Sequence, residues 1–299
     1  MKNILLTAVV PISKMAGRIE LLREWTKEAV NLGIEIVIVH DIQDNLTQAD
    51  LDALITELQS PLLQLVTGEF RSPGLARNAG KKIARGEWIA FWDSDDRPNP
   101  AAILEMVVQS SDTDSDIAIG NFEWFDETRQ TIRVDVRRKM TLNNVAMNVG
   151  IWRFTIRKSI VNKIDFRPYR LGEDQVFASE AIGLAREINF YNKAVYRYYF
   201  GGSGHLSNNI LNRDDLVLAN LAVEKLLLLQ RDGDAQSFLT KLWLRQRITM
   251  LRHSEKNWAI IKILKNAITI GPRTIPFSVR LFAAVDVLYL LIKEQITKI

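Results

Sequence analysis

The chain contains no cysteine and only three histidines among its 299 residues. Without thiols it can form no disulfide, no thiolate metal site and no cysteine nucleophile, which is typical of a reducing compartment. A zinc site is also poorly supplied, because zinc sites in proteins are built mainly from cysteine and histidine. A metal bound by this chain would therefore depend on oxygen ligands.

Long apolar runs are also missing. No stretch reaches the roughly 18 consecutive apolar residues that a membrane span requires. Residues 4–10 superficially resemble the apolar part of a signal peptide, but no small-residue cleavage site follows them, so we interpret them as a first buried strand. Hydrophobic content is 47% and the charged fraction 25%. Such values are typical of a globular protein with a sizeable core, forming one large domain or one domain with an extension.

Charge is distributed unevenly along the chain. From Arg213 onward there are 14 Lys and Arg against 8 Asp and Glu, a net charge of +6. Residues 1–212 contain 25 against 27, a net charge of −2. The basic part carries no aromatic-interleaved basic motif and no known binding module, so we expect no nucleic-acid partner.

The first hundred residues alternate between strand-type and helix-type patterns. We expect strands at 3–12, 34–39, 62–67 and 88–92, and helices at 18–32, 47–59 and 74–85. Pro11 is expected to end the first strand, and Thr47 to cap the second helix. The alternation predicts an α/β fold with a mostly parallel central sheet flanked by helices. Ligands of such sheets bind at the carboxyl ends of the strands.

The rest of the chain is less regular. Strands are expected at 115–125, 130–137 and 190–200, and a helix at 172–185. Residues 201–205 are rich in glycine and predict a loop. From Arg213 onward the pattern predicts three or four helices.

Three aspartates follow the fourth expected strand within four positions: Asp93, Asp95 and Asp96. One interpretation is a solvated turn, because Asp-rich turns are common. The other is a divalent cation held by Asp95, with Asp93 on its other side, since Mg²⁺ prefers carboxylate and phosphate oxygens.

Two further stretches allow a structural and a functional interpretation. Arg77 lies where SPGLARNAG opens a helix, and it is either a solvated side chain or a guanidinium that meets a nucleobase or phosphate. Glu173 and Asp174 lie in the first turn of another expected helix. They either stabilise its dipole or include a general base that accepts a hydroxyl proton.

Taken in order, these motifs resemble the GT-A glycosyltransferases of the inverting family 2 type, which act in bacterial polysaccharide, capsule and O-antigen synthesis. The resemblance covers roughly residues 3–210. It is carried by VVPISKMAGRIELL, IVIVHDIQDN, SPGLARNAGKKIARGEWIAFWDSDD and NKIDFRPYRLGED, of which the third contains the Asp-x-Asp metal motif.

The resemblance implies roles for the residues of these motifs. Asp95 would ligate Mn²⁺ or Mg²⁺ at the donor diphosphate, and Asp93 would bind ribose or assist the metal. Asp174 would be the catalytic base, with Glu173 orienting it or the acceptor. Arg77 would lie on the nucleotide side of the cleft.

Further nucleotide-side residues follow from the same resemblance. They are Pro11 and Ser13, Asp41 beside the uracil or an equivalent base, and His205 in a mobile loop at 201–207. His205 could equally be an ordinary loop residue. The chain departs from the family by having Ser13 where an aromatic residue is common and His40-Asp41 where paired aspartates are common. A UDP-sugar is our first choice of donor, and because of these departures dTDP- and GDP-sugars stay open.

We expect two domains: a catalytic domain at 1–212, which carries the resemblance, and a helical subdomain at 213–299, which lies outside it. The apolar segment 276–293 allows two interpretations. Its faces pack within a helical subdomain or a homodimer, or they contact a membrane whose anionic lipid suits the +6 charge. Under both interpretations we expect the protein in the cytoplasm, and under the second it also contacts the inner face of the plasma membrane peripherally.

The resemblance therefore implies an inverting glycosyltransferase of the hexosyltransferase type. It would move a sugar from a nucleoside-diphosphate sugar to a hydroxyl of a glycan or lipid-linked glycan. Trp124, Trp152 and Arg153 are candidate acceptor contacts or, alternatively, parts of an aromatic core. Two other functions stay open: a metal-dependent phosphohydrolase or phosphotransferase with Asp93 as nucleophile, and a non-catalytic subunit that binds sugar nucleotides.

Overall fold

The computed structural model describes residues 3–15, 19–42, 45–134, 140–200, 213–230 and 233–252. These residues form two compact units, one comprising 3–140 and 150–200 and the other 141–149 and 213–252. The expected division between residues 212 and 213 stays a prediction, because the residues around it lie outside the described ranges.

The first unit contains the strands and most of the helices. In chain order they are β1 (Leu6–Ile12), α1 (Ile19–Asn31), β2 (Glu35–Asp41), α2 (Asn45–Leu58), β3 (Leu63–Gly68), α3 (Pro73–Ile83), β4 (Trp88–Phe91), β5 (Arg97–Pro98), α4 (Pro100–Asp112), β6 (Ile117–Asp126), β7 (Thr131–Val134), the 3₁₀ turn η1 (Ile151–Arg153), β8 (Phe154–Arg157), α6 (Lys158–Val161), α7 (Glu173–Leu184) and β9 (Ile188–Phe200).

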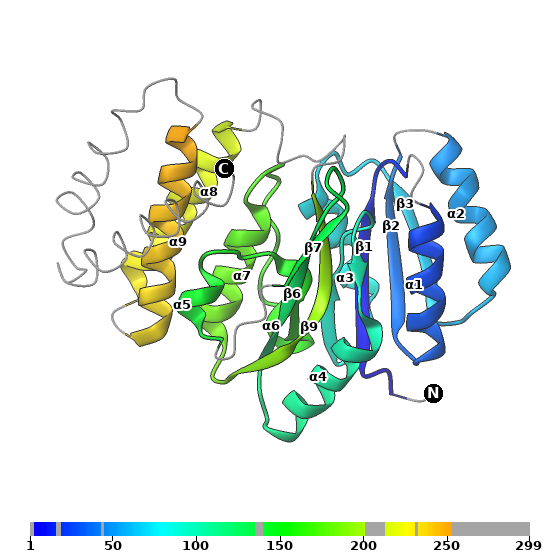
Figure 1. Ribbon diagram of the computed structural model, residues 1–299, viewed down its shortest axis with the longest axis horizontal. Helices are drawn as coiled ribbons and strands as arrows, with labels where there is room; N and C mark the ends of the chain where they lie inside the picture. Colours follow the sequence, from blue (N-terminus) through cyan, green and yellow to red (C-terminus); the bar gives the residue numbers. More distant parts are fainter. Residues whose placement is uncertain are drawn as a thin grey trace. The chain divides into compact units, whose positions relative to one another are not determined.

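One sheet runs through this unit in the order β3-β2-β1-β4-β8-β6-β9-β5, and β7 pairs with β6 (Figure 1). The four strands β3, β2, β1 and β4 are mutually parallel. Beyond β4 the pairing is mixed, because β8 is antiparallel to both β4 and β6 while β6 and β9 are parallel. The α/β fold is confirmed, and its parallel part is the half that precedes the aspartate cluster.

Both faces of the parallel half are covered, as expected of strands that are mostly apolar. On one face, alternate residues of β1 and β2 pack with α1, α2 and α4 around Trp25 and Trp92. On the other face, Phe91 of β4 contacts Phe177 of α7 edge-on at 5.4 Å between ring centroids. The sheet therefore lies between two helical layers, and the carboxyl ends of its strands remain available for a site.

Helix α3 begins and packs as its sequence dictates. The Ser72 side chain caps it by accepting from the Leu75 N–H, and Pro73 occupies the first turn, where no N–H is needed. Gly80 lets the helix approach the sheet closely, because an added Cβ would lie 2.8 Å from Val39 Cγ2 and against Val9 as well. This close packing brings the first turns of α3 to the carboxyl end of β4.

Two local expectations were wrong. Pro11 does not end the first strand, since β1 continues to Ile12 and stays in register with β2, with Pro11 opposite Val39. Thr47 does not begin the second helix, which begins at Asn45. The Thr47 hydroxyl instead accepts from the backbone N–H of Met15, 32 residues away. This tertiary contact outweighed the local capping preference.

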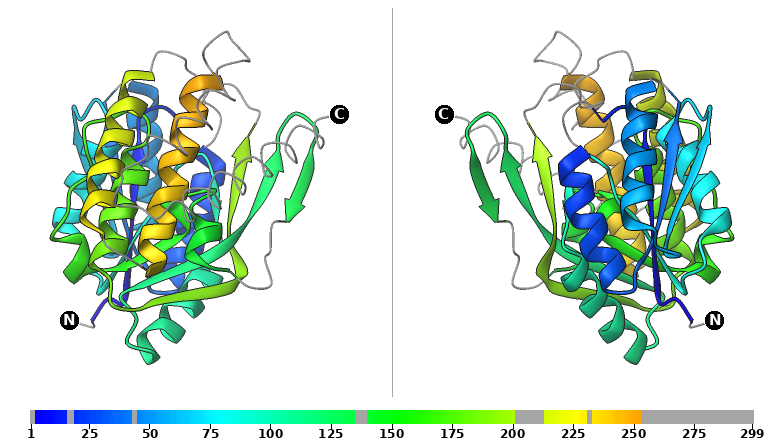
Figure 2. Two further views of the ribbon diagram at one scale, coloured as in Figure 1. Left: turned by 90° about the vertical axis from the view of Figure 1, so that its left-hand side faces the viewer. Right: turned by 90° about the vertical axis from the view of Figure 1, so that its right-hand side faces the viewer.

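The far part of the sheet was predicted less completely. Helix α4, which begins at Pro100 after an Asn99 cap, was not predicted. Strand β6 is irregular where its register against β9 shifts between Gly120 and Phe122. Figure 2 shows β6 and β7 as a hairpin standing beside the end of β9.

The second unit is helical, with α5 (Leu142–Val145), α8 (Arg213–Leu229) and α9 (Gly233–Arg252). Helices α8 and α9 pack on each other, and Asn220 of α8 donates to the Trp243 carbonyl of α9 at 3.0 Å. Within the described ranges, none of the helices has the length and apolarity needed to cross a bilayer. The segment 276–293 lies outside the described residues, so contact with a membrane and a homodimer stay predictions.

Candidate active site

The acidic residues predicted to form the site lie at the carboxyl ends of β2 and β4 and at the start of α7. Asp41 is the last residue of β2, and Asp93 is the second residue after the end of β4. Helix α7 begins with Glu173 and Asp174. All belong to the first unit. Chain topology thus brings residues more than 100 positions apart to one edge of the sheet.

Arg77 joins two of these groups directly. Its Nη2 donates to Asp93 Oδ1 at 2.7 Å, and its Nη1 donates to Glu173 Oε1 at 2.8 Å. The Arg77 and Glu173 side chains are 5% and 8% exposed, so their ion pair is shielded from water, while Asp93 is 27% exposed. Such a buried, two-sided pair is strongly directional because the guanidinium fork is planar. Arg77 therefore fixes the aspartate motif relative to the start of α7.

The electrostatics of the three partners follow from this arrangement. Burial lowers the pKa of Arg77, but Asp93, Glu173 and Asp174 outweigh burial and raise that pKa above its ordinary value. Burial raises the pKa of Glu173, and Arg77 opposes that rise. Arg77 remains a cation between carboxylates, so its one positive charge is shared by Asp93 and by Glu173 at the start of α7.

Asp174 has the properties of a proton acceptor near neutral pH. Burial, followed by the charge of Glu173, raises the pKa of Asp174 to about 7, while Arg77 opposes the rise. Its Oδ1 accepts from the Gln175 N–H at 2.8 Å, which fixes the carboxyl at the helix start. Gly172 precedes the helix with a φ of 85°, a left-handed conformation that favours glycine. A base works best when its pKa lies near the working pH.

Asp96, the third aspartate of the cluster, is almost fully buried. Its Oδ1 accepts from the Tyr199 N–H of β9 at 2.8 Å, and its Oδ2 has no hydrogen-bond partner among the residues that the structure describes. Burial, and then the charges of Asp95 and Asp93, raise the pKa of Asp96 well above its ordinary value. Asp96 thus links the metal motif to β9, a role that its sequence position did not reveal.

Tyr196 of β9 is a second residue that the sequence reasoning missed. Its hydroxyl accepts from the Asp93 backbone N–H at 3.0 Å, 103 residues away in the chain. The ring stacks on Trp152 with centroids 4.5 Å apart. The sequence offers only an aromatic-rich strand, YRYYF, which gives no sign of a contact with the aspartate turn.

The aspartate cluster fits a divalent cation. Within the described parts of the chain, no group of three or more Asp, Glu, His or Cys side chains is arranged to hold a metal. A cation here would take one or two carboxylates plus substrate phosphate, which is the usual ligand set of Mg²⁺. Burial is the main cause of the raised pKa of Asp96, and the charges of Asp95 and Asp93 add to it; a cation would relieve this second, repulsive part. Asp95 and Asp93 are the residues that would hold it.

Asp41 already has backbone partners. Its Oδ1 accepts from the Phe70 N–H at 2.7 Å and its Oδ2 from the Arg71 N–H at 2.9 Å. Arg71 has a φ of 62°, so the carboxylate stabilises a left-handed turn just before α3. Asp41 therefore shapes the loop between β3 and α3, and its contact with a base stays a prediction.

The other predicted nucleotide-side residues are placed in part. Pro11 is half-buried in β1, and Ser13 is exposed directly after that strand. His205 and the loop 201–207 lie outside the described residues. The roles of all three stay predictions.

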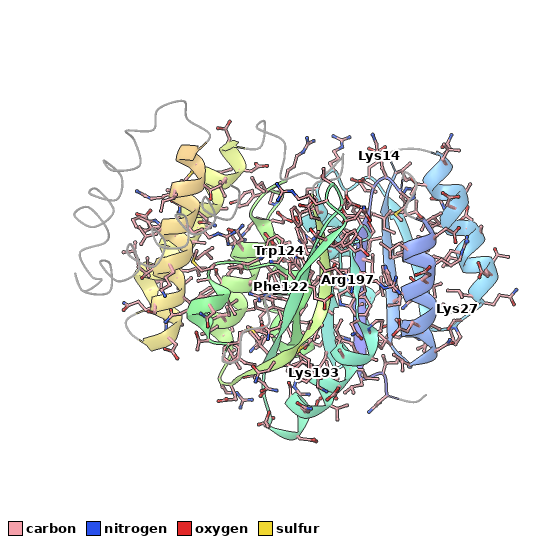
Figure 3. All side chains as sticks on the ribbon, viewed as in Figure 1. Lys14, Lys27, Phe122, Trp124, Lys193 and Arg197 are labelled. Atoms are coloured by element: carbon pink, nitrogen blue, oxygen red, sulfur yellow. The ribbon has the colours of Figure 1, made fainter. Side chains whose placement is uncertain are left out.

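The candidate acceptor residues lie in an aromatic cluster formed by β6, β9 and η1. Trp152 and Arg153 are 5% and 4% exposed. Trp124 is half-buried and meets Tyr198 edge-on at 5.3 Å between centroids. Figure 3 shows Trp124 and Phe122 on β6. The structure therefore gives these residues core contacts, and their contact with an acceptor stays a prediction.

Comparison with known protein families identifies the family of this chain. The profile described as Glycosyl transferase family 2 matches residues 14–170, which is more than half of the chain. The chain belongs to glycosyl transferase family 2. It is a glycosyltransferase, and the matched range includes Asp41, Arg77 and the aspartate cluster but ends before Glu173.

Curated relatives agree with this assignment. The chain is 26% identical to the glycosyltransferase GlyG of Streptococcus pneumoniae over 215 residues, covering 65% of this chain and 70% of GlyG. It is 35% identical over 91 residues to the succinoglycan biosynthesis protein ExoO of Rhizobium meliloti, covering 30% of this chain and 25% of ExoO. A third relative is the poly(ribitol-phosphate) β-N-acetylglucosaminyltransferase TarP of Staphylococcus aureus, 28% identical, with 44% of each chain covered. The alignments thus span from a quarter to 70% of these relatives.

Solved structures confirm the GT-A fold. Residues 1–349 of S. aureus TarS in complex with UDP-GlcNAc superimpose with a TM-score of 0.69 at 19% identity, covering 90% of this chain and 82% of that one. The mannosyltransferase PcManGT of Pyrobaculum calidifontis, in complex with GDP-Man and Mn²⁺, gives a TM-score of 0.54 at 15% identity, covering 95% of this chain and 87% of that one.

Proposed function

We propose that the chain transfers a sugar, with inversion, from a UDP-sugar to a hydroxyl group of a glycan or lipid-linked glycan. The observation that carries this proposal is the Arg77 bridge. It ties Asp93 of the metal motif to Glu173, the neighbour of a carboxyl group whose pKa is about 7. The carboxylate of the proposed donor site, Asp93, and the carboxylate beside the proposed base, Glu173, thus pair with the same buried cation, Arg77.

The reaction needs one bond to form as another breaks. The acceptor hydroxyl oxygen attacks the anomeric carbon, and the bond from that carbon to the phosphate oxygen breaks, leaving its electron pair on the nucleoside diphosphate. The hydroxyl proton passes to the carboxylate of Asp174. Attack from the face opposite the leaving group inverts the anomeric configuration.

The departing diphosphate carries growing negative charge. A Mn²⁺ or Mg²⁺ ion held by Asp95 and Asp93 would supply Lewis-acid stabilisation of that charge. Arg77 contributes by neutralising Asp93 and Glu173, so these carboxylates repel the diphosphate less. UDP is favoured because TarS, which has the same fold, was crystallised with UDP-GlcNAc.

Donor turnover tests this proposal. Wild-type protein with UDP-GlcNAc and Mn²⁺ is expected to release UDP, faster when a glycan acceptor is present. Proton NMR of the product is expected to show the anomeric configuration opposite to that of the donor. Asp174→Asn is expected to lower the rate by about 10²- to 10⁴-fold, while the exposed control Asp112→Asn leaves it unchanged.

Three results would contradict the proposal. Near-normal transfer by Asp174→Asn would remove the base assignment. A covalent intermediate trapped on Asp93 would support a metal-dependent phosphohydrolase or phosphotransferase instead. Donor binding without any turnover would favour a non-catalytic subunit.

A further inference from the structure

Besides Arg77, helix α3 has three further residues that face the segment preceding α7. Gly74, Asn78 and Lys81 lie at helical spacing from Arg77 and share its side of the helix. All three contact the segment 161–167, which leads to Glu173 and Asp174.

Asn78 holds the backbone of Phe166 on both sides. Its Nδ2 donates to the Phe166 carbonyl at 2.9 Å, and its Oδ1 accepts from the Phe166 N–H at 2.9 Å. This pair of bonds imitates a strand pairing across 88 residues of sequence. The Phe166 ring stacks on Phe177 of α7 with centroids 3.8 Å apart and lies 5.4 Å from the Arg77 guanidinium. Asn78 is thereby connected to α7 through one aromatic ring.

Lys81 holds the same segment five residues upstream. Its ammonium group donates to the Val161 carbonyl at 3.0 Å and to the Ile164 carbonyl, and it pairs with Asp165 at 2.9 Å. The Lys81 side chain is 7% exposed. A buried lysine is costly unless its donors are all used, and these partners use them. The next residue, Lys82, is exposed and offers a matched control.

Close packing completes the contact. A Cβ added at Gly74 would lie 2.6 Å from the Arg167 carbonyl oxygen and 3.2 Å from Glu173 Cγ. The first turn of α3 therefore touches both the segment and the carboxylate pair.

We propose that Asn78 and Lys81 are positioning residues, which hold the segment 161–167 on α3 and thereby set Glu173 and Asp174 relative to Asp93. This inference rests on the proposed function for its catalytic consequence. Neither side chain needs to touch donor or acceptor. Loss of either should displace the base while leaving the nucleotide side intact.

The test uses Asn78→Ala and Lys81→Met, with Asn31→Ala and Lys82→Met as exposed controls. Hydrogen exchange is expected to become at least about tenfold faster across residues 161–175 in the first pair only. The kcat for donor turnover is expected to fall at least about tenfold, with the Kd for UDP and Mn²⁺ changed by less than about threefold. Asn78→Asp keeps the acceptor for the Phe166 N–H and loses the donor, so an intermediate effect is expected.

Unchanged exchange across 161–175 would overturn the inference, as would an equal loss of kcat and UDP affinity. Should either main variant fail to fold, Asn78→Asp and Lys81→Arg replace the main variants. Hydrogen exchange and kcat equal to those of the exposed controls in both variants would overturn the inference. A wild-type protein that releases no UDP would contradict the proposed function alone, because the exchange measurement does not depend on turnover.

Discussion

At the scale of single residues, Asp174 is the group whose environment most strongly determines chemistry. Its pKa of about 7 arises from burial and from Glu173, with Arg77 opposing both. The sequence analysis placed this carboxyl in the first turn of a helix, but a raised pKa could not be read from that position. Only the fold brings Arg77, Asp93 and Glu173 together around it.

A pH dependence of turnover follows. A base must be deprotonated to accept a proton, so kcat/KM is expected to fall about tenfold per pH unit below about pH 7. The rate profile of the wild-type protein between pH 5 and 9 measures this limb. A limb that begins near pH 4 would mean that the base has an ordinary carboxylic pKa.

A second prediction at this scale concerns stability. The folded-state pKa of Asp174 is raised, so the unfolded chain loses this proton first and stability falls as the pH rises from about 4 to about 7. Asp174→Asn removes this penalty and is expected to be more stable than wild type at pH 8. Each kcal/mol gained would raise Tm by about 2–4 °C.

Thermal unfolding at pH 5 and pH 8 measures this effect. The gain of Asp174→Asn should shrink at the lower pH, whereas the exposed control Asp112→Asn should show no such dependence. A variant that is less stable than wild type at pH 8 would contradict the assigned pKa direction.

At the scale of elements, α3 organises the site. Its close approach to the sheet depends on Gly80, where a methyl group would collide with Val9 and Val39. Gly80→Ala is expected to destabilise the protein by about 1–3 kcal/mol through overpacking. Gly183→Ala in α7 has open space around the added methyl, so it is expected to be neutral or stabilising by up to about 1 kcal/mol.

Urea unfolding of both glycine variants gives this comparison directly. The expected result is a lower unfolding free energy for Gly80→Ala and an unchanged or higher one for Gly183→Ala. Equal effects of the two substitutions would show that α3 can move away from the sheet without cost.

Local patterns predicted most elements because β1, β2 and β4 are mostly apolar and α1 and α3 carry clear amphipathic spacing. The errors have tertiary causes. Pro11 lies inside β1, where it pairs with Val39 of β2. The Thr47 hydroxyl accepts from the Met15 N–H instead of capping its own helix. The mixed half of the sheet beyond β4 depends on pairing between distant strands, which no local pattern encodes.

At the scale of the whole molecule, family membership and fold agree with the motifs recognised in the sequence. The acidic groups were predicted by type and position. Their mutual contacts were not, because the bond from Arg77 to Glu173 spans 96 residues and the Tyr196 contact with Asp93 spans 103. Contacts of that range come from topology.

The most direct measurement of the central claim is a thermal-shift titration with UDP, GDP, dTDP and CDP, each with and without Mn²⁺. A ligand that binds only the folded state raises apparent stability by mass action. We predict a large shift for UDP that requires Mn²⁺ and disappears in Asp95→Ala. A folded protein that shows no shift with any nucleotide would contradict a donor site at the aspartate cluster.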